Sequence, residues 1–190
     1  IYAENDMETW RDLLYYVAQV LGCICLINRE GKLQLVPYSD TAVITIPQRE
    51  RFSSSYSDFV TRYTAISSTN QLKEISEYYA LDPDDALTMN LGINPLLQFG
   101  LAATRERILM NILYALSKVE YVPFDSSTIG NPALDPMDIV QFTGGHADAD
   151  KVSCITSITY NINGKHSLKC VGKNPKLSAA LSLIHISEPT

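Results

Sequence analysis

The sequence lacks the local patterns that mark common catalytic and membrane-bound proteins. Its 190 residues contain no GxSxG or HExxH motif and no glycine-rich phosphate loop before a helix. No apolar run reaches the length of a membrane span, and no signal peptide stands at the start. The first residue is Ile1, so we expect the chain to be cut from a longer protein. We expect no membrane insertion, and local sequence indicates no active site.

Positive charge and cysteine are both scarce. The chain has 15 Lys and Arg against 21 Asp and Glu, and its net charge of −6 argues against nucleic acid as a main partner. No CxxC pair occurs, and all the cysteines lie in apolar, strand-like stretches: Cys23, Cys25, Cys154 and Cys170. We interpret them as buried free thiols rather than zinc ligands or disulfides. No cofactor is indicated.

The last ten residues differ in character from the rest. Leu181 to Thr190 reads LSLIHISEPT, which resembles the translation of a transposase sequencing adapter, CTG TCT CTT ATA CAC ATC TCC GAG CCC ACG. Every residue matches. We interpret 181–190 as a read-through scar, with a genuine short tail as the alternative, and exclude it from the fold prediction.

The stretch from Thr9 to Val36 predicts an amphipathic helix that runs directly into a β-hairpin. An apolar stripe at helical spacing comprises Trp10, Leu13, Leu14, Val17, Ala18 and Leu21. Thr9 with Asp12 fits a capping box, and Gly22 stands where a glycine ends a helix. Cys23 to Asn28 is apolar on both faces, and Arg29, Glu30 and Gly31 suit a turn with a left-handed bulge residue. The helix stripe must be buried on something, and the hairpin is the first candidate.

Elsewhere the sequence predicts one more helix and a series of short strands. The helix, 101–117, has an apolar stripe of Leu101, Ile108, Leu109, Ile112, Leu113 and Leu116. Its charged residues Arg105, Glu106 and Arg107 are expected largely on the solvent side. Strands are expected at 42–46, 59–68, 73–81 (or a short helix), 86–91, 119–124, 139–143, 152–160 and 166–171. Loops are expected at 48–57 and 125–138.

Together these elements indicate an α+β fold, with two amphipathic helices and several antiparallel β-hairpins. The closely spaced strands of the last third favour a small β-barrel or sandwich. Along the chain we distinguish a helix-plus-hairpin unit at 1–44, a β-rich segment at 45–100, and a helix followed by a small β-barrel-like segment at 101–180.

Two acidic clusters are candidate metal sites, and a simpler interpretation is favoured for each. His146, Asp148 and Asp150 alternate and could hold a divalent metal, but a solvated hairpin loop fits their glycine-led context better. Asp82, Pro83, Asp84 and Asp85 could form a calcium loop but lack the spacing of an EF-hand. A helical turn with Asp82 as N-cap fits them better.

Catalytic and sugar-binding constellations are also weak. A cysteine–histidine nucleophile pair stays open, although Cys154 and Cys170 lie in expected strands, where thiols are usually inert. The chain has 11 tyrosines, and a sugar-binding platform could be formed by Tyr15, Tyr16, Tyr78 and Tyr79. Packing groups or subunit contacts are the better interpretation of tyrosines in such positions.

Five blocks of the sequence, taken in order, resemble one protein family. They are TWRDLLYYVAQVLGC–NREGKL, NPLLQ, ILMNILYAL–YVPF, GNPALDPMDIVQF and ITSITYNINGKHSLKCVGKNPKL. They are similar to tail proteins of phages and prophages of Gram-positive hosts, variously called minor structural, tail-associated or prophage endopeptidase tail proteins. The resemblance covers nearly all of 7–177. Met137 departs from the pattern, because the family usually has glycine before Asp138, and this bears on the turn geometry there.

The resemblance implies a structural role at the tip of a phage tail. In this family the N-terminal region resembles the baseplate hub of contractile tails and forms a homotrimeric ring of β-barrel and α/β subdomains. The ring docks on the distal tail protein and lets the tape-measure protein and DNA pass. The chain is thus expected to be made in the bacterial host cytoplasm and built into the virion, with a part in tail assembly and in host attachment or DNA passage.

The resemblance implies no enzymatic activity for this stretch. Some members carry peptidase or muralytic domains further towards the C-terminus, but the motifs found here are structural. We therefore expect no catalytic, cofactor-binding or metal residues and no specific nucleic-acid binding.

Two other functions stay open at this point. A cell-wall hydrolase or peptidase would bring His146 or His166 close to a cysteine or an acid. A carbohydrate-binding tail module would present coplanar exposed tyrosines beside Asp or Asn.

Overall fold

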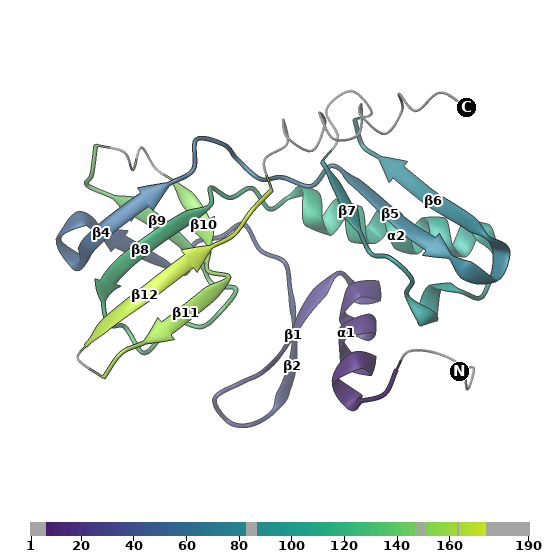
Figure 1. The fold of residues 1–190 in the computed structure, drawn as a ribbon, viewed down its shortest axis with the longest axis horizontal. Coiled ribbons are helices and arrows are strands. Elements are labelled where there is room, and N and C mark those ends of the chain that lie inside the picture. Colours follow the sequence, from purple (N-terminus) through teal and green to yellow (C-terminus); the bar gives the residue numbers. More distant parts are fainter. Residues whose placement is uncertain (1–6, 83–86, 147, 149–150, 163, 174–190) are drawn as a thin grey trace, which may run out of the picture. The chain divides into compact units, whose positions relative to one another are not determined.

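The structure, a computed structural model, describes residues 7–82, 87–146, 148, 151–162 and 164–173 (Figure 1). The chain forms two compact units, and each draws on two separate stretches: 1–38 with 63–119, and 39–62 with 120–190. The sequence was divided into consecutive segments at residues 44 and 100. In the structure, stretches of the first unit and of the second unit alternate along the chain. The expected scar at 181–190 and the proposed helical turn after Asp82 lie outside the described residues.

The first unit begins with the predicted helix and hairpin. Helix α1 spans Trp10–Leu21, and its capping box is formed as expected between Thr9 and Asp12. Gly22 ends the helix with a φ of 61°, in the left-handed region that glycine adopts without strain. Strands β1 (Cys23–Ile27) and β2 (Leu33–Pro37) pair antiparallel, with Gly31 at a φ of 75° in the turn between them.

A three-stranded sheet and a long helix complete this unit. Strand β5 (Ala65–Asn70) pairs antiparallel with β6 (Ile75–Ala80) and parallel with β7 (Thr88–Asn90). Helix α2 (Ala102–Ser117) packs its apolar stripe against this sheet around Ile66 and Leu97. The short 3₁₀ helices η2 (Gln71–Lys73) and η3 (Pro95–Leu97) occupy the connections.

Buried Asn94 ties the start of η3 to α1. Its side-chain amide donates to the carbonyl of Tyr16 at 3.3 Å and to Oε1 of Gln19 at 3.0 Å, and its own oxygen accepts from the N–H of Leu96. The C-terminal half of α1 is therefore held by polar contacts as well as by packing against α2.

The second unit is a β-sandwich. One sheet has the order β11–β12–β8–β4 and is antiparallel throughout; its strands are β4 (Arg51–Tyr56), β8 (Phe124–Ile129), β11 (Ser157–Tyr160) and β12 (Lys165–Cys170). The other has the order β10–β9–β3, with strands β3 (Ile44–Pro47), β9 (Ile139–Thr143) and β10 (Val152–Cys154). The two sheets enclose one apolar core, in which Phe124 and Phe142 meet edge to face at 4.8 Å.

The fold class is confirmed: the described residues form two helices and many strands in several sheets, without a closed barrel. Several predicted elements need correction. The expected loop at 48–57 is the 3₁₀ helix η1 (Gln48–Glu50) followed by β4, and the first half of the expected loop at 125–138 is β8. The segments 59–64 and 119–123 form no strand, apart from an isolated bridge between Thr61 and Tyr121. Within the described part of the chain, neither helix is long and apolar enough to cross a membrane.

Candidate functional site

Helix α1 exposes much of its apolar stripe. Of its residues only Ala18 is buried, while Leu21 is exposed and the side chain of Trp10 is 81% exposed. The predicted docking of the stripe is thus only partly achieved by the residues that the structure describes. An exposed tryptophan on an amphipathic helix is typical of a surface that binds another molecule.

The β1–β2 hairpin is equally apolar and equally exposed. Gln34 is the only polar residue in its two strands, and three of the large apolar residues are exposed, namely Ile27 (72%), Leu33 (53%) and Leu35 (40%). Strands that are apolar on both faces are usually buried on both faces. We call the exposed side chains of Trp10, Leu21, Ile27, Leu33 and Leu35 the helix–hairpin surface.

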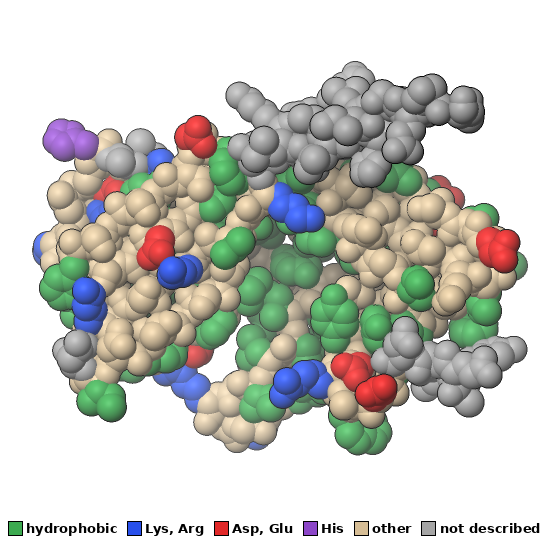
Figure 2. All heavy atoms as spheres, in the orientation of Figure 1, with side chains coloured by type: hydrophobic (Ala, Val, Ile, Leu, Met, Phe, Trp, Pro, Cys, Tyr) green, Lys and Arg blue, Asp and Glu red, His purple; other side chains and the backbone are tan. Residues whose placement is uncertain are grey.

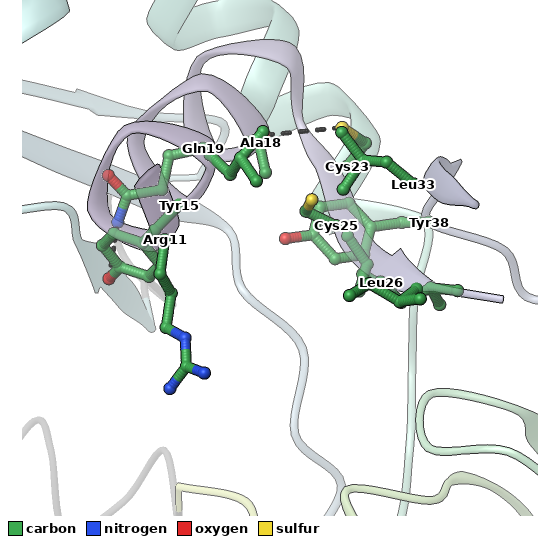
Figure 3. A pocket seen from close by; sticks show the side chains of 12 residues that line it. Arg11, Tyr15, Ala18, Gln19, Cys23, Cys25, Leu26, Leu33 and Tyr38 are labelled. Carbon is green, nitrogen blue, oxygen red and sulfur yellow. Dashed lines mark hydrogen bonds between the residues drawn. The ribbon is translucent and has the colours of Figure 1, made fainter. Parts of the chain in front are cut away.

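A groove of about 530 Å³ lies between the helix and the hairpin. Figure 3 shows side chains of α1 on one side of this open space and those of β1, Leu33 and Tyr38 on the other. We call it the α1–β1 groove; it is lined by Arg11, Leu14, Tyr15, Ala18, Gln19, Cys23, Ile24, Cys25, Leu26, Ile27, Leu33 and Tyr38. Its volume is in the range of sites that bind a small molecule or part of a partner protein.

The chemistry of the groove favours apolar binding over catalysis. The Cys23 thiol lies 3.7 Å from the carbonyl of Ala18, and burial raises the pKa of this thiol, so it stays protonated at neutral pH. Tyr15 accepts a hydrogen bond from Gln19 at 2.8 Å, and Arg11 is the only charged residue in the lining. Figure 2 shows hydrophobic side chains at the lower end of α1 and on the hairpin, with basic and acidic groups beside the lower part of α1.

The structure separates the residues of the first candidate metal site. His146 is exposed, Asp150 lies outside the described residues, and Asp148 is buried in an ion pair. Asp148 bonds both terminal nitrogens of Arg51 and accepts from the hydroxyl of Tyr56 at 2.8 Å and from the N–H of Gly145. These bonds, led by those from Arg51, hold the pKa of Asp148 well below its usual value. The solvated-loop interpretation of Asp148 was therefore wrong.

The second acidic cluster cannot be assembled from the described residues, because Asp84 and Asp85 lie outside them. Within the described ranges, no group of three or more His, Cys, Asp or Glu side chains is placed to hold a metal ion.

The candidate cysteines and histidines do not form a nucleophilic pair in the positions described. His166 and Cys170 lie four residues apart on β12, about 13 Å along the strand. Burial raises the pKa of Cys154 to about 12 and also raises that of Cys170, which is the opposite of activation. The ring of His166 packs edge to face against Tyr160 at 4.8 Å.

Tyr15 and Tyr16, two of the tyrosines considered as a possible sugar platform, are not coplanar. The rings of Tyr15 and Tyr16 meet at 64°, with centroids 5.4 Å apart. Tyr78 is half exposed on β6, and Tyr79 is partly buried against the core of the first unit. This arrangement fits packing better than a flat sugar-binding face.

Two buried ion pairs were not predicted from the sequence. Arg51 was placed in an exposed loop, and Arg105 on the wet side of its helix, but Arg105 is 1% exposed. Its Nε and Nη2 donate to the carboxylate of Glu77 at 2.9 and 2.7 Å, and its Nη1 donates to the carbonyl of Gly100 at 2.8 Å. The one signal in the sequence was position: Arg105 precedes buried Leu109 by four residues and so shares its helix face.

The fold is similar to those of two solved structures. One is the 43 kDa tail protein of prophage MuSo2 from Shewanella oneidensis, with 14% identity and a TM-score of 0.54 over 93% of this chain and 57% of that one. The other is the tail protein from Neisseria meningitidis MC58, with 14% identity and a TM-score of 0.52 over 90% of this chain and 57% of that one. The chain thus spans a little over half the length of each. No protein-family model and no curated protein sequence matches it.

Proposed function

We propose that this chain is a structural component of a phage tail tip, in which copies of it form part of a homotrimeric hub ring. Two independent lines support this function. The five sequence blocks resemble phage and prophage tail proteins, and the fold is similar to those of two tail proteins. The proposed place of action is the virion, where the chain takes part in tail assembly and in host attachment or DNA passage.

The observation that carries the proposal is the helix–hairpin surface. A tryptophan, an isoleucine and three leucines exposed on one helix and one hairpin are costly in water, at about 1.5–3 kcal/mol for each large side chain left unburied. A subunit of an assembly buries such side chains against its neighbours, whereas a protein that works alone rarely keeps them together on its surface. The distal tail protein and the tape-measure protein are the other expected partners.

A structural role is favoured over an enzymatic one for this stretch. Buried Nδ1 of His166 has no hydrogen-bond partner among the described residues, and burial raises the pKa values of the Cys154 and Cys170 thiols. The buried acid Asp148 is fully engaged by Arg51, Tyr56 and Gly145, which leaves it no free oxygen for a substrate. Any peptidase or muralytic activity would belong to another part of a longer protein.

Electron microscopy of the phage particles tests the proposed location. Antibodies raised against the purified chain are expected to label the tip of the tail, and antibodies against a capsid protein of the same phage serve as the control. Label confined to the capsid, or absent from intact and gently opened particles, would refute the tail-tip location. Light scattering on the full chain is expected to give the mass of a trimer.

Incubation with purified cell walls tests the enzymatic alternative. The chain is expected to release no soluble muropeptides, under conditions in which a known muralytic enzyme releases them. Release that disappears in His166→Ala or His146→Ala would replace the structural function with a catalytic one.

A further inference from the structure

The α1–β1 groove has two sides that are mostly apolar. The helix side is one face of α1 and consists of Arg11, Leu14, Tyr15, Ala18 and Gln19. The other side consists of all five residues of β1 together with Leu33 and Tyr38. Figure 3 shows the two sides across an open space. At about 530 Å³ the groove is large enough for a small organic molecule.

The uncharged polar side chains on the helix side are already hydrogen-bonded within the chain. The amide of Gln19 donates to the hydroxyl of Tyr15 at 2.8 Å, and its oxygen accepts from the amide of Asn94 at 3.0 Å. A peptide in the groove would bring N–H and C=O groups along its whole length, and each needs a partner when it leaves water. An alkyl chain carries no such groups, so it suits this lining better than a peptide.

One positive charge accompanies this apolar lining. Arg11 is exposed and is the only charged residue among those that line the groove. In Figure 3 its guanidinium extends from α1 into the open space, away from the amide of Gln19 and the ring of Tyr38. A guanidinium binds a carboxylate through two parallel hydrogen bonds. The lining therefore complements a molecule with one alkyl chain and a carboxylate at its end.

We infer that the α1–β1 groove binds a fatty acid, with the alkyl chain between α1 and β1 and the carboxylate at Arg11. Each methylene that leaves water adds to the affinity, and Arg11 selects the charge of the head group. This site goes beyond the proposed tail-tip function and does not require a ring. Trp10, Leu21 and Leu35 of the helix–hairpin surface lie outside the lining and stay exposed to a neighbouring subunit.

Calorimetric titration of the full chain with octanoate, decanoate and dodecanoate tests the alkyl part of this inference. Each ligand is used below its critical micelle concentration. Saturable binding is expected, and the Kd should fall roughly tenfold for every two carbons added, because each buried methylene contributes a similar gain.

A variant that fills the groove and a matched control test the location. Cys25→Trp places an indole in the lining and should raise the Kd for dodecanoate by about tenfold or more. Ile162→Trp places the same indole at an exposed position between β11 and β12 and should leave the Kd as in wild type. Circular dichroism shows whether each variant is folded.

Charge reversal at Arg11 tests the head group. Wild type is expected to bind dodecanoate about three- to tenfold more tightly than dodecyltrimethylammonium, which has the same alkyl chain and a cationic head. Arg11→Glu should reverse this preference, and an acidic residue in the first turn is also favourable for α1. A variant that misfolds would lose both ligands, so a reversal distinguishes head-group recognition from structural damage.

Alkylation of Cys25 places the ligand in the groove directly. Cys25 is partly exposed in the lining, whereas the other cysteines are buried. Dodecanoate at ten times its Kd should slow the reaction of Cys25 with N-ethylmaleimide by about tenfold, because only the empty groove reacts. Mass spectrometry of the digested chain measures the extent of reaction at this residue.

The contrary outcomes are equally defined. Absence of saturable binding, an unchanged Kd in folded Cys25→Trp, or an unchanged head-group preference in folded Arg11→Glu would each overturn the fatty-acid site. Protection of Cys25 that requires phospholipid vesicles or another tail protein, and does not occur with dodecanoate, would overturn the fatty acid as the occupant. A chain that stays monomeric would contradict the proposed ring and leave this inference standing.

Discussion

Among individual residues, the buried ion pair of Arg51 and Asp148 is the most consequential. It joins β4 to the loop after β9, with Tyr56 as a third member, across 97 residues of sequence. Both side chains are almost fully buried. Removal of one partner from such a pair leaves the other charge without compensation, which usually costs about 3–5 kcal/mol.

We therefore expect Asp148→Asn to lower the free energy of unfolding by about 3 kcal/mol, measured by urea denaturation at pH 7. Asp125→Asn is the matched control, because Asp125 pairs with Lys169 at 2.8 Å on the surface, where an ion pair contributes about 1 kcal/mol at most. Similar losses in the two variants would contradict the assigned role of the buried pair.

The same pair predicts a pH dependence. The pKa of Asp148 is lowered in the folded chain, so its contribution is complete above the unfolded-state pKa of about 4 and is lost as pH falls below that value. In wild type the free energy of unfolding should decrease between roughly pH 4 and pH 2 more steeply than in Asp148→Asn. Parallel pH profiles for the two chains would exclude this linkage.

Met137 has a backbone conformation that favours glycine. Its φ is 77°, in the turn where its N–H donates to the carbonyl of Ile155 at 2.6 Å. The sequence identified this position as a departure from the glycine of the resembled family, and the structure gives the physical reason for that glycine. A side chain in the left-handed region costs about 1–2 kcal/mol, partly offset by the lower flexibility of the unfolded chain.

Met137→Gly is thus expected to raise the free energy of unfolding by about 0.5–1 kcal/mol, measured by urea denaturation. Lys118→Gly, at a φ of −77°, is the control and should lower it, because glycine gains nothing in an ordinary helical conformation. A lower stability for Met137→Gly would mean that packing of the methionine side chain outweighs backbone strain.

For whole elements, short-range signals predicted α1 and the β1–β2 hairpin well. The capping box, the ending glycine and the turn glycine each act within a few residues, so their effect is visible in sequence. Strands β4 and β8 were missed for the opposite reason. Their sequences RFSSSY and FDSSTI are rich in serine, and what makes them strands is pairing with each other, including the Ser54–Ser126 hydroxyl contact at 2.8 Å.

The capping box of α1 gives a prediction for this element. The hydroxyl of Thr9 accepts from the N–H of Asp12, and the carboxylate of Asp12 accepts from the N–H of Thr9 at 2.8 Å. Because α1 has few buried side chains, its start depends heavily on these bonds. Thr9→Ala should lower the stability of α1 by about 1 kcal/mol, seen as faster amide exchange in its first turns.

The exposed loop residue Thr41 supplies the control for this change. Thr41→Ala removes the same hydroxyl from a residue outside any helix or strand, so exchange in α1 should stay as in wild type. Unchanged exchange in Thr9→Ala as well would show that tertiary contacts such as those of Asn94, rather than the cap, determine the stability of α1.

At the level of the whole molecule, the alternation of the two units could not be predicted. The chain leaves the first unit after residue 38, returns at 63 and leaves again after 119. Strand β3 pairs in parallel with β9, nearly 100 residues later, and no local pattern encodes such a partner. The buried ion pairs follow the same rule, because Arg51 and Arg105 are recognisable as core residues only when their distant carboxylates are known.

Charged and apolar side chains are distributed differently in the described part of the molecule. Two buried pairs of charged side chains, Arg51–Asp148 and Arg105–Glu77, stabilise its interior, while the exposed residues of the helix–hairpin surface are apolar. The proposed assembly has an observable that a monomer lacks, namely dependence on concentration.

Trp10 makes that observable accessible, because it is the only tryptophan of the chain. Its side chain is 81% exposed in a single copy, so a dilute solution should show the red-shifted emission of a tryptophan in water. If neighbouring copies cover the helix–hairpin surface, emission should shift to the blue as concentration rises. The midpoint of this shift should fall at the same concentration as the midpoint of the increase in mass measured by sedimentation.

Leu35→Lys, which places a charge on this surface, should keep the red-shifted emission at all concentrations. Ile162→Lys, which places the same charge on an exposed isoleucine between β11 and β12, should behave like wild type. A trimer that forms without any change in Trp10 emission would place the subunit contact away from α1.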